Sequence, residues 1–415
     1  MEVDAFTSRL GPEPSHRFDP LADYLALARP TYEQRFQFQR LLHQRGQMLN
    51  FHSSGTFGWK FDSNPIRFSS WKSDRRFRLE TYAYAGNVVH LRGICFHTGD
   101  ILLCNRASAS DGIFTTLAEG RQSFAHVAVY ALLRDSQGLY PAALEIHREG
   151  VRAVPLKVFL DDNFHAYLEV FRANEVGSEC HSRIVDVGLQ MLTETHGFDI
   201  DMDQTQDVYV SCALMAAQLY RRAGLTPARP GSRYNPSVMP NLEILGNTSS
   251  ANRDLLMPDD YSRDPRFSLV GLVDNGRFFD LLARGLVRER MQEVWQTMVL
   301  EPARFPFGHA LMRFTVRHLQ RQTWPLAHLL APRMGFKTDS FPSGPTTFIA
   351  LVPTVEARIE KATSTIAARF RAYEGEVLGL PSARSIADHP SIQQLVCAAM
   401  AEFESLFRAR TRPLE

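Results

Sequence analysis

The chain has 415 residues, 44 % of them hydrophobic and 22 % charged, a composition typical of a globular protein with two or three domains. Its 46 basic and 45 acidic residues leave a net charge of +1, so no overall field attracts it to a polyanion and nucleic-acid binding is disfavoured. The five cysteines form no CxxC pair and are odd in number. They predict neither a zinc site nor a disulfide framework and indicate a reducing compartment.

The first ninety residues, 1–90, are expected to form an N-terminal helix with an irregular extension. Residues 1–10 lack the basic segment and apolar core of a signal peptide, and no uncharged apolar run in the chain reaches the ~20 residues that cross a bilayer. We therefore expect cytoplasmic synthesis, and signal-independent secretion stays open. A helix is predicted over 32–49, followed by loops and short strands over 51–79 that lead into a strand at 88–91.

Two apolar runs, 124–133 and 140–147, read as strands joined by the polar turn 134–138. An antiparallel hairpin centred in that turn would make His126 and Glu145 near cross-strand neighbours, because their numbers sum to 271. A carboxylate at hydrogen-bond distance would orient the imidazole and raise its basicity. A strand histidine is, however, more often a satisfied core residue than a catalytic base.

Cys212 stands where an extended run, 207–211, turns into a helix predicted over 212–223. Ser211 is the expected N-cap and Gly224 the expected end of the helix. Unpaired N–H groups and the positive end of the dipole at a helix start favour a thiolate over a thiol. The competing interpretation is that Cys212 only packs in a core, on one helical face with Met215 and Leu219.

The stretch between Glu145 and Cys212 must hold additional structure. Residues 185–195 have helical spacing and are expected to cover the site. The acidic run 198–203 lacks the glycine and terminal glutamate of a calcium loop and is predicted to be a solvated loop. No metal or organic cofactor is expected.

Several short motifs occur in an order that resembles a known family. These are Gly99-Asp-Ile-Leu-Leu103, Phe124-Ala-His-Val-Ala-Val129, Leu144-Glu-Ile146 with 150–156, and Val210-Ser-Cys-Ala-Leu214. The order histidine, acidic partner, cysteine is similar to that of the circularly permuted NlpC-type papain-like hydrolases and acyltransferases, which include YiiX-like and lecithin:retinol acyltransferase-like enzymes. The resemblance implies that Cys212 is the nucleophile, His126 the base and Glu145 its orienting partner, with Gly99 and Asp100 structural.

The fold expected from this resemblance is α+β. It comprises a permuted papain-like core over 91–225, an antiparallel sheet or small barrel with the cysteine helix packed on it, and a mainly helical C-terminal region. Prolines and glycines over 226–268 predict a connecting segment wrapped on the surface. Over 269–415 apolar residues recur at helical spacing, in particular from Val355 to Tyr373 behind Thr354 and from Ile392 to Leu406 behind Pro390.

These residues together predict a thiol-dependent acyl hydrolase or acyltransferase that forms a covalent acyl-enzyme. A lipid acyl ester is slightly favoured as substrate, because the family resemblance includes lipid acyltransferases and because two basic and aromatic clusters, 68–78 and 311–321, suit peripheral contact with an anionic membrane. Both clusters are also compatible with ordinary solvated surface. The alternatives are an amidase or peptidase that acts on peptide-like bonds of cell walls, and a non-catalytic papain-like binding module with a helical interaction domain. Protein partners are not predicted.

Overall fold

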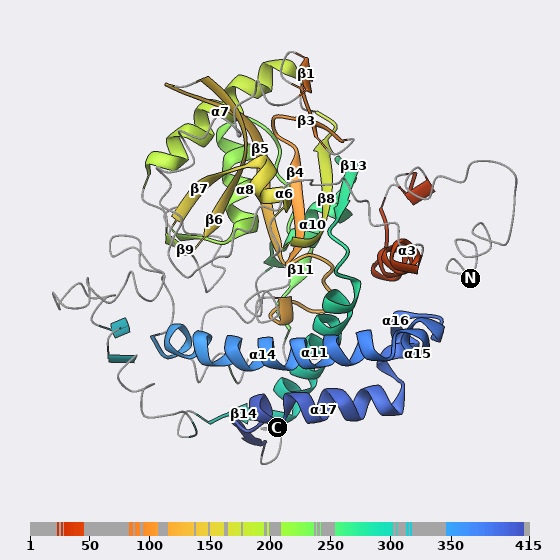
Figure 1. Cartoon of the computed structure of the whole chain (residues 1–415). Helices are drawn as coiled ribbons and strands as arrows, with labels where there is room; N and C mark the ends of the chain where they lie inside the picture. The colour runs from red at the N-terminus through yellow and green to blue at the C-terminus, as the bar shows by residue number, and fades with distance from the viewer. Residues whose placement is uncertain are drawn as a thin grey trace, which may run out of the picture.

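The computed structural model describes residues 23–44, 83–106, 115–198, 209–241, 254–304 and 346–410, with some positions left out within these ranges, and part of 313–317. Figure 1 shows a sheet flanked by helices, with a layer of long helices beyond one end of it. The predicted α+β class, with a helical C-terminal region, is confirmed. The cluster predicted at 68–78 and the strands and loops predicted over 51–79 lie outside the described residues.

The centre of the molecule is a six-stranded antiparallel sheet in the order β13-β8-β4-β5-β6-β7. The strands are β4 (Ile101–Arg106), β5 (His126–Asp135), β6 (Gly138–His147), β7 (Gly150–Pro155), β8 (His165–Ala173) and β13 (Phe267–Asp274). Nearly every residue of β5 is buried, because both faces of the sheet are covered.

One face of the sheet packs against α7 (Ser178–Thr193) and α8 (Cys212–Arg222). The other face is covered by α6 (Leu156–Asp161) and by a small sheet of β1 (Ala83–Ala85), β2 (Val88–Leu91) and β3 (Ile94–His97). Helix α7 includes most of the helical spacing predicted at 185–195, but it begins earlier and ends at Thr193. At residue 188 a glycine allows close packing, since an added Cβ would meet Leu144 of β6 at 2.6 Å.

The predicted hairpin is present, with its register shifted by two residues. Residues of β5 and β6 pair so that Val129 faces Leu144, which makes each pair sum to 273. Glu145 therefore lies opposite Ala128 and diagonal to His126. Diagonal neighbours on the same face remain within reach of long side chains.

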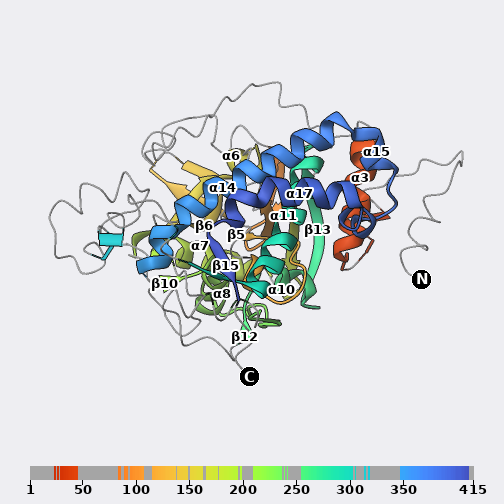
Figure 2. The same ribbon diagram turned by 90° about the horizontal axis from the view of Figure 1, so that it is seen from below.

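The C-terminal layer consists of α11 (Phe278–Thr297), α14 (Thr346–Ala372), α15 (Glu374–Gly379), α16 (Ala383–Ala387) and α17 (Pro390–Glu404). Strands β14 (Met298–Leu300) and β15 (Phe407–Ala409) pair beside it. In Figures 1 and 2, α11 leaves the sheet and runs into the layer that α14 and α17 form. The predicted apolar faces of α14 and α17 are buried or half-buried, except at Tyr373, which is exposed and lies beside Arg369. Thr354 is not an N-cap, because α14 starts eight residues earlier.

The prediction that 226–268 is a connecting segment on the surface is partly wrong. It contains β11 (Ser232–Arg233), β12 (Asp254–Leu255) and the short helix α10 (Pro258–Arg263), in which Asp259, Asp260 and Tyr261 are buried, and it ends inside β13 of the central sheet. Pro258 occupies the first turn of α10, where a missing N–H costs nothing, so this proline begins a helix and does not break one.

The N-terminal helix predicted over 32–49 is observed as α3 (Tyr32–Gln44). Its side chains Arg35, Phe36 and Phe38 are buried, although the chain around them is polar. Helix α3 packs against α11, and its Arg35 contacts Glu169 of β8, so α3 is part of the same core as the central sheet.

Candidate active site

His126 and Glu145, which the sequence predicted to be neighbours, are in contact. The Nε2 atom of His126 lies 2.6 Å from Oε2 of Glu145, and both side chains are buried. The other carboxylate oxygen of Glu145 accepts a hydrogen bond of 2.7 Å from Nε of Arg152, whose second nitrogen is also within 2.5 Å. One buried carboxylate thus joins an imidazole to a guanidinium.

Sequence reasoning missed Arg152, although a signal was present. Strand β7 follows β6 after a tight turn, and Arg152 pairs directly with Glu145 across that hairpin. The constant sum of residue numbers that predicted His126 near Glu145 can be applied to the hairpin of β6 and β7. It would have placed Arg152 opposite Glu145. A cation beside the carboxylate favours its ionised form, which is the form that orients an imidazole.

Strand alternation assigns this cluster to a face of the sheet. Val127 and Val129 of β5 belong to the core beneath α8, whereas Ala128 and Tyr130 belong to the core beneath β3 and α6. Since side chains alternate along a strand, His126 has the parity of the second face. As the first residue of β5, it stands at the end of the sheet, where the two cores meet the loop that precedes the strand.

Cys212 begins helix α8 as predicted. Ser211 is the N-cap, with an extended backbone, and its hydroxyl accepts a hydrogen bond of 3.3 Å from the Leu214 N–H. The Cys212 side chain is half-buried, whereas the following residues of the helix, from Ala213 to Tyr220, are buried. The thiol is therefore more accessible than the enclosed middle of the helix.

Two tyrosines fix α8 at its two ends. The hydroxyl of Tyr220 donates to the carbonyl of Gly99, and the N–H of Gly99 donates in turn to Tyr130 of β5. At the other end Tyr261 of α10 donates to the carbonyl of Ala213 at 3.1 Å. The last turn of the helix thus lies by Tyr130, and its first turn lies by α10.

Gly99 and Asp100, which were expected to be structural, directly precede β4. Gly99 has φ of 101°, a conformation that favours glycine, at the start of β4. The buried carboxylate of Asp100 accepts two hydrogen bonds of 2.8 Å from Arg172 and one from the His97 N–H. Burial raises the pKa of Asp100, and the hydrogen bonds from Arg172 oppose that rise.

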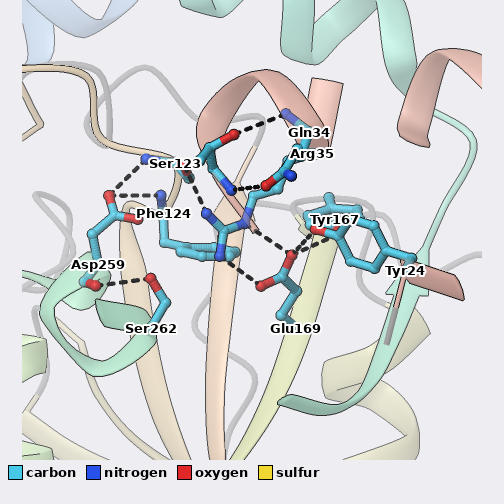
Figure 3. Close-up of polar contacts among 10 residues, drawn as sticks. Tyr24, Gln34, Arg35, Ser123, Phe124, Tyr167, Glu169, Asp259 and Ser262 are labelled. Atoms are coloured by element: carbon cyan, nitrogen blue, oxygen red, sulfur yellow. Dashed lines mark hydrogen bonds and ion pairs between the residues drawn. The ribbon is translucent and has the colours of Figure 1, made fainter. Parts of the chain in front are cut away.

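A second buried carboxylate, Glu169 of β8, binds four donors. Figure 3 shows Arg35, Tyr24 and Tyr167 converging on it. Tyr24 and Tyr167 donate at 2.6 and 2.7 Å, and Arg35 donates two hydrogen bonds of 2.9 Å. Burial and the charge of Glu169 raise the pKa of both tyrosines well above the ordinary value, so they stay neutral. The cluster attaches α3 to the sheet.

Other kinds of site are not seen in the part of the chain that the structure describes. Within it, no three histidine, cysteine, aspartate or glutamate side chains gather as metal ligands. Among the same residues, no helix is both long enough and apolar enough to span a membrane. Most of the acidic run 198–203 and most of the basic cluster 311–321 lie outside the described residues, apart from positions such as Phe314, which is 50 % exposed.

Comparison with known proteins supports the family resemblance of this region. No curated protein and no solved structure matches the chain. Residues 95–231, which hold β3 to β8, α7 and α8, match the model of a family described as permuted papain-like amidase enzymes of the YaeF/YiiX type, the C92 family. This family supports a cysteine hydrolase. The region 95–231 is therefore a permuted papain-like domain of the YaeF/YiiX type.

Proposed function

We propose that the chain is a thiol-dependent acyl hydrolase in which Cys212 is the nucleophile, His126 the general base and Glu145 the residue that orients the imidazole. The observation that carries the proposal is the buried 2.6 Å contact between His126 and Glu145, two residues selected from sequence for this role. A histidine held by a carboxylate has the orientation and basicity required to take a proton from a thiol.

The lengths of the elements support a meeting of Cys212 and His126 at the end of the sheet. From Cys212 to Tyr220 the helix rises about 12 Å, and from His126 to Tyr130 the strand extends about 13 Å. Tyr220 is attached beside Tyr130 through Gly99, and α10 contacts both the first turn of α8 and the loop before β5. Two spans of similar length therefore run from Tyr130 toward α10. On this proposal the sulfur approaches the imidazole where β5 begins, rather than across the face that α8 covers.

The proposed reaction has two steps, formation of an acyl thioester and its hydrolysis. The Cys212 thiolate attacks the carbonyl carbon, and the electron pair of the C=O bond moves to oxygen, where the Cys212 N–H at the helix start stabilises the oxyanion. Collapse of this intermediate breaks the bond to the leaving group, which takes a proton from His126, and leaves an acyl thioester. Water then gives a proton to His126, attacks the thioester and releases the acid and the thiolate.

Amide bonds are the first substrate class to test, since the matched family is described as amidases. The lipid acyl ester favoured from sequence remains a prediction, because the basic and aromatic clusters behind it lie mostly outside the described residues. Acyl transfer differs from hydrolysis only in the acceptor of the thioester. All of these reactions would use Cys212 as the nucleophile. They differ in the bond that is attacked or in the group that accepts the acyl chain.

The test compares wild-type protein with Cys212→Ala and with Cys180→Ala, a matched control that removes a buried cysteine of α7. Both variants are given peptidoglycan fragments, phospholipid vesicles and chromogenic acyl amides and esters. We expect turnover of at least one class by wild type and Cys180→Ala and none by Cys212→Ala. Equal turnover by Cys212→Ala would refute the assignment, and no turnover combined with ordinary thiol reactivity of Cys212 at pH 6 would favour the binding module.

A further inference from the structure

The loop that leads into His126 is held by elements outside the papain-like domain. Asp259 of α10 accepts a hydrogen bond of 2.6 Å from the Ser123 N–H and a longer one of 3.4 Å from the Phe124 N–H. Figure 3 shows this carboxylate aimed at both backbone nitrogens. Asp259 is only 1 % exposed, so its carboxylate contacts this loop and is shielded from solvent.

Two arginines hold the same loop from other sides. Arg35 of α3 donates to the Ser123 hydroxyl at 3.4 Å, and its guanidinium lies 4.7 Å from the centre of the Phe124 ring. Arg288 of α11, also buried, donates to the Gln122 carbonyl. Three consecutive residues, ending two positions before His126, are therefore fixed by α3, α10 and α11.

Helix α10 also contacts the other half of the proposed reactive pair. Two residues after Asp259, Tyr261 donates to the Ala213 carbonyl in the first turn of α8, directly after Cys212. After burial, the charge on Cys212 is the largest influence that raises the pKa of Tyr261, which is consistent with a short separation. One short helix thus touches the approach to the histidine and the start of the cysteine helix.

We propose that α10 is a brace that sets the distance between Cys212 and His126, with Asp259 and Tyr261 as positioning residues and Arg288 as a second support for the histidine loop. The inference rests on the proposed function, and it adds residues that the matched region 95–231 does not contain. It also gives the segment beyond that region a role in catalysis. A displacement of about 1 Å in a reacting group lowers a rate about a hundredfold.

The experiment uses the full chain with Asp259→Asn, Tyr261→Phe and Arg288→Lys, and with Asp264→Asn as control. Asp264 follows α10 and pairs with Arg266 at 2.5 Å, so the control removes an ion pair at the same helix without touching residues 122–124 or the first turn of α8. Each protein is assayed for kcat and KM on the chromogenic acyl substrate that wild type turns over. Alkylation of Cys212 by iodoacetamide is followed by mass spectrometry from pH 5 to 9.

We expect Asp259→Asn to lower kcat about a hundredfold with little change in KM. The pH at which the rate of Cys212 alkylation is half its maximum should also rise toward about 8.5, the pKa of an ordinary thiol. Tyr261→Phe and Arg288→Lys should lower kcat about tenfold, with the same split between kcat and KM. Asp264→Asn should lower the melting temperature and leave kcat and the alkylation profile as in wild type.

The outcomes separate the brace from the proposed function. An inactive wild type with an ordinary Cys212 alkylation profile contradicts the proposed function itself. An active wild type, with Asp259→Asn and Tyr261→Phe no more impaired than Asp264→Asn, overturns the brace and leaves the hydrolase in place. If Asp259→Asn does not fold, Tyr261→Phe and Arg288→Lys decide the matter by the same comparison.

Discussion

Two buried glutamates of one sheet, Glu145 on β6 and Glu169 on β8, have similar surroundings and different partners. Each is at most 1 % exposed, and each binds an arginine through two nitrogens. Glu145 also contacts an imidazole, whereas Glu169 also binds two phenols. An imidazole exchanges protons near neutral pH and the phenols do not, so burial and pairing alone do not distinguish a catalytic carboxylate from a structural one.

The largest expected effect comes from replacing His126, the imidazole that Glu145 contacts. His126→Ala removes the group that moves protons in both steps, so we expect kcat/KM to fall about ten-thousandfold, or about 5 kcal/mol in transition-state free energy. Steady-state kinetics on the substrate that wild type turns over measures this loss. Near-UV circular dichroism provides the control for folding, because Glu145 keeps its bond to Arg152. Loss of less than tenfold would remove His126 from the mechanism.

Arg35→Met tests how much the buried ion pair between Arg35 and Glu169 stabilises the fold. It leaves a buried carboxylate without its counter-charge, and breaking a buried pair in this way costs about 4 kcal/mol of the free energy of unfolding. Burial alone would lower the pKa of Arg35, but the charge and hydrogen bonds of Glu169 together with the charges of Tyr24 and Asp259 raise it. Urea unfolding measures the loss.

Glu169→Leu added to Arg35→Met supplies the control, because it removes the stranded charge. We expect the double variant to regain part of the stability that Arg35→Met loses. If Arg35→Met alone unfolds at the same urea concentration as wild type, the cluster does not hold α3 to the sheet.

A third carboxylate, Asp274 at the end of β13, shows what burial does without an arginine. Burial raises its pKa from 3.8 to about 6, against a hydrogen bond from the Gly276 N–H. Because the folded state holds this proton more tightly than the unfolded state, the stability it contributes is present below pH 4 and is lost as the pH rises to about 6. The full loss is about 3 kcal/mol.

Asp274→Asn stays neutral and should not show this loss. Urea unfolding of wild type and variant at intervals from pH 4 to 7 measures the difference, which should grow in favour of the variant as the pH rises. A difference that is independent of pH would mean that the Asp274 carboxyl titrates at its ordinary value in the folded protein.

The contrast between the glutamates also marks how far the sequence could lead. His126 and Glu145 are 19 residues apart on one hairpin, where short apolar runs and a polar turn predict the pairing, and even a register error of two residues left them in contact. The start of α8 was likewise predicted from Ser211 and its end from Gly224, because caps are local signals.

Contacts between distant segments had no such signal. Arg35 and Glu169 are 134 residues apart, and a polar helix gives no sign that one of its arginines is buried. Asp259 lies in a segment whose prolines were read as breakers, although Pro258 starts a helix there. The residues that hold the site together were therefore harder to predict than the residues proposed to react.

Glu145→Gln is the smallest and most discriminating change, because it keeps the shape of the side chain and removes its charge. The amide can still accept a hydrogen bond from His126, but it no longer stabilises the imidazolium, so we expect kcat to fall about thirtyfold, or about 2 kcal/mol. The loss should be smaller than for His126→Ala, and the pH–rate profile should shift. A larger loss than for His126→Ala would mean that the two roles are misassigned.

Glu169→Gln is the matched control on the same sheet. It also removes one buried negative charge beside an arginine, so it should lower the free energy of unfolding at least as much as Glu145→Gln. Its pH–rate profile should stay that of wild type, because neither the tyrosines nor Arg35 change protonation in that range. Equal shifts in both variants would show that the profile reports the general field of the sheet and not the imidazole that Glu145 holds.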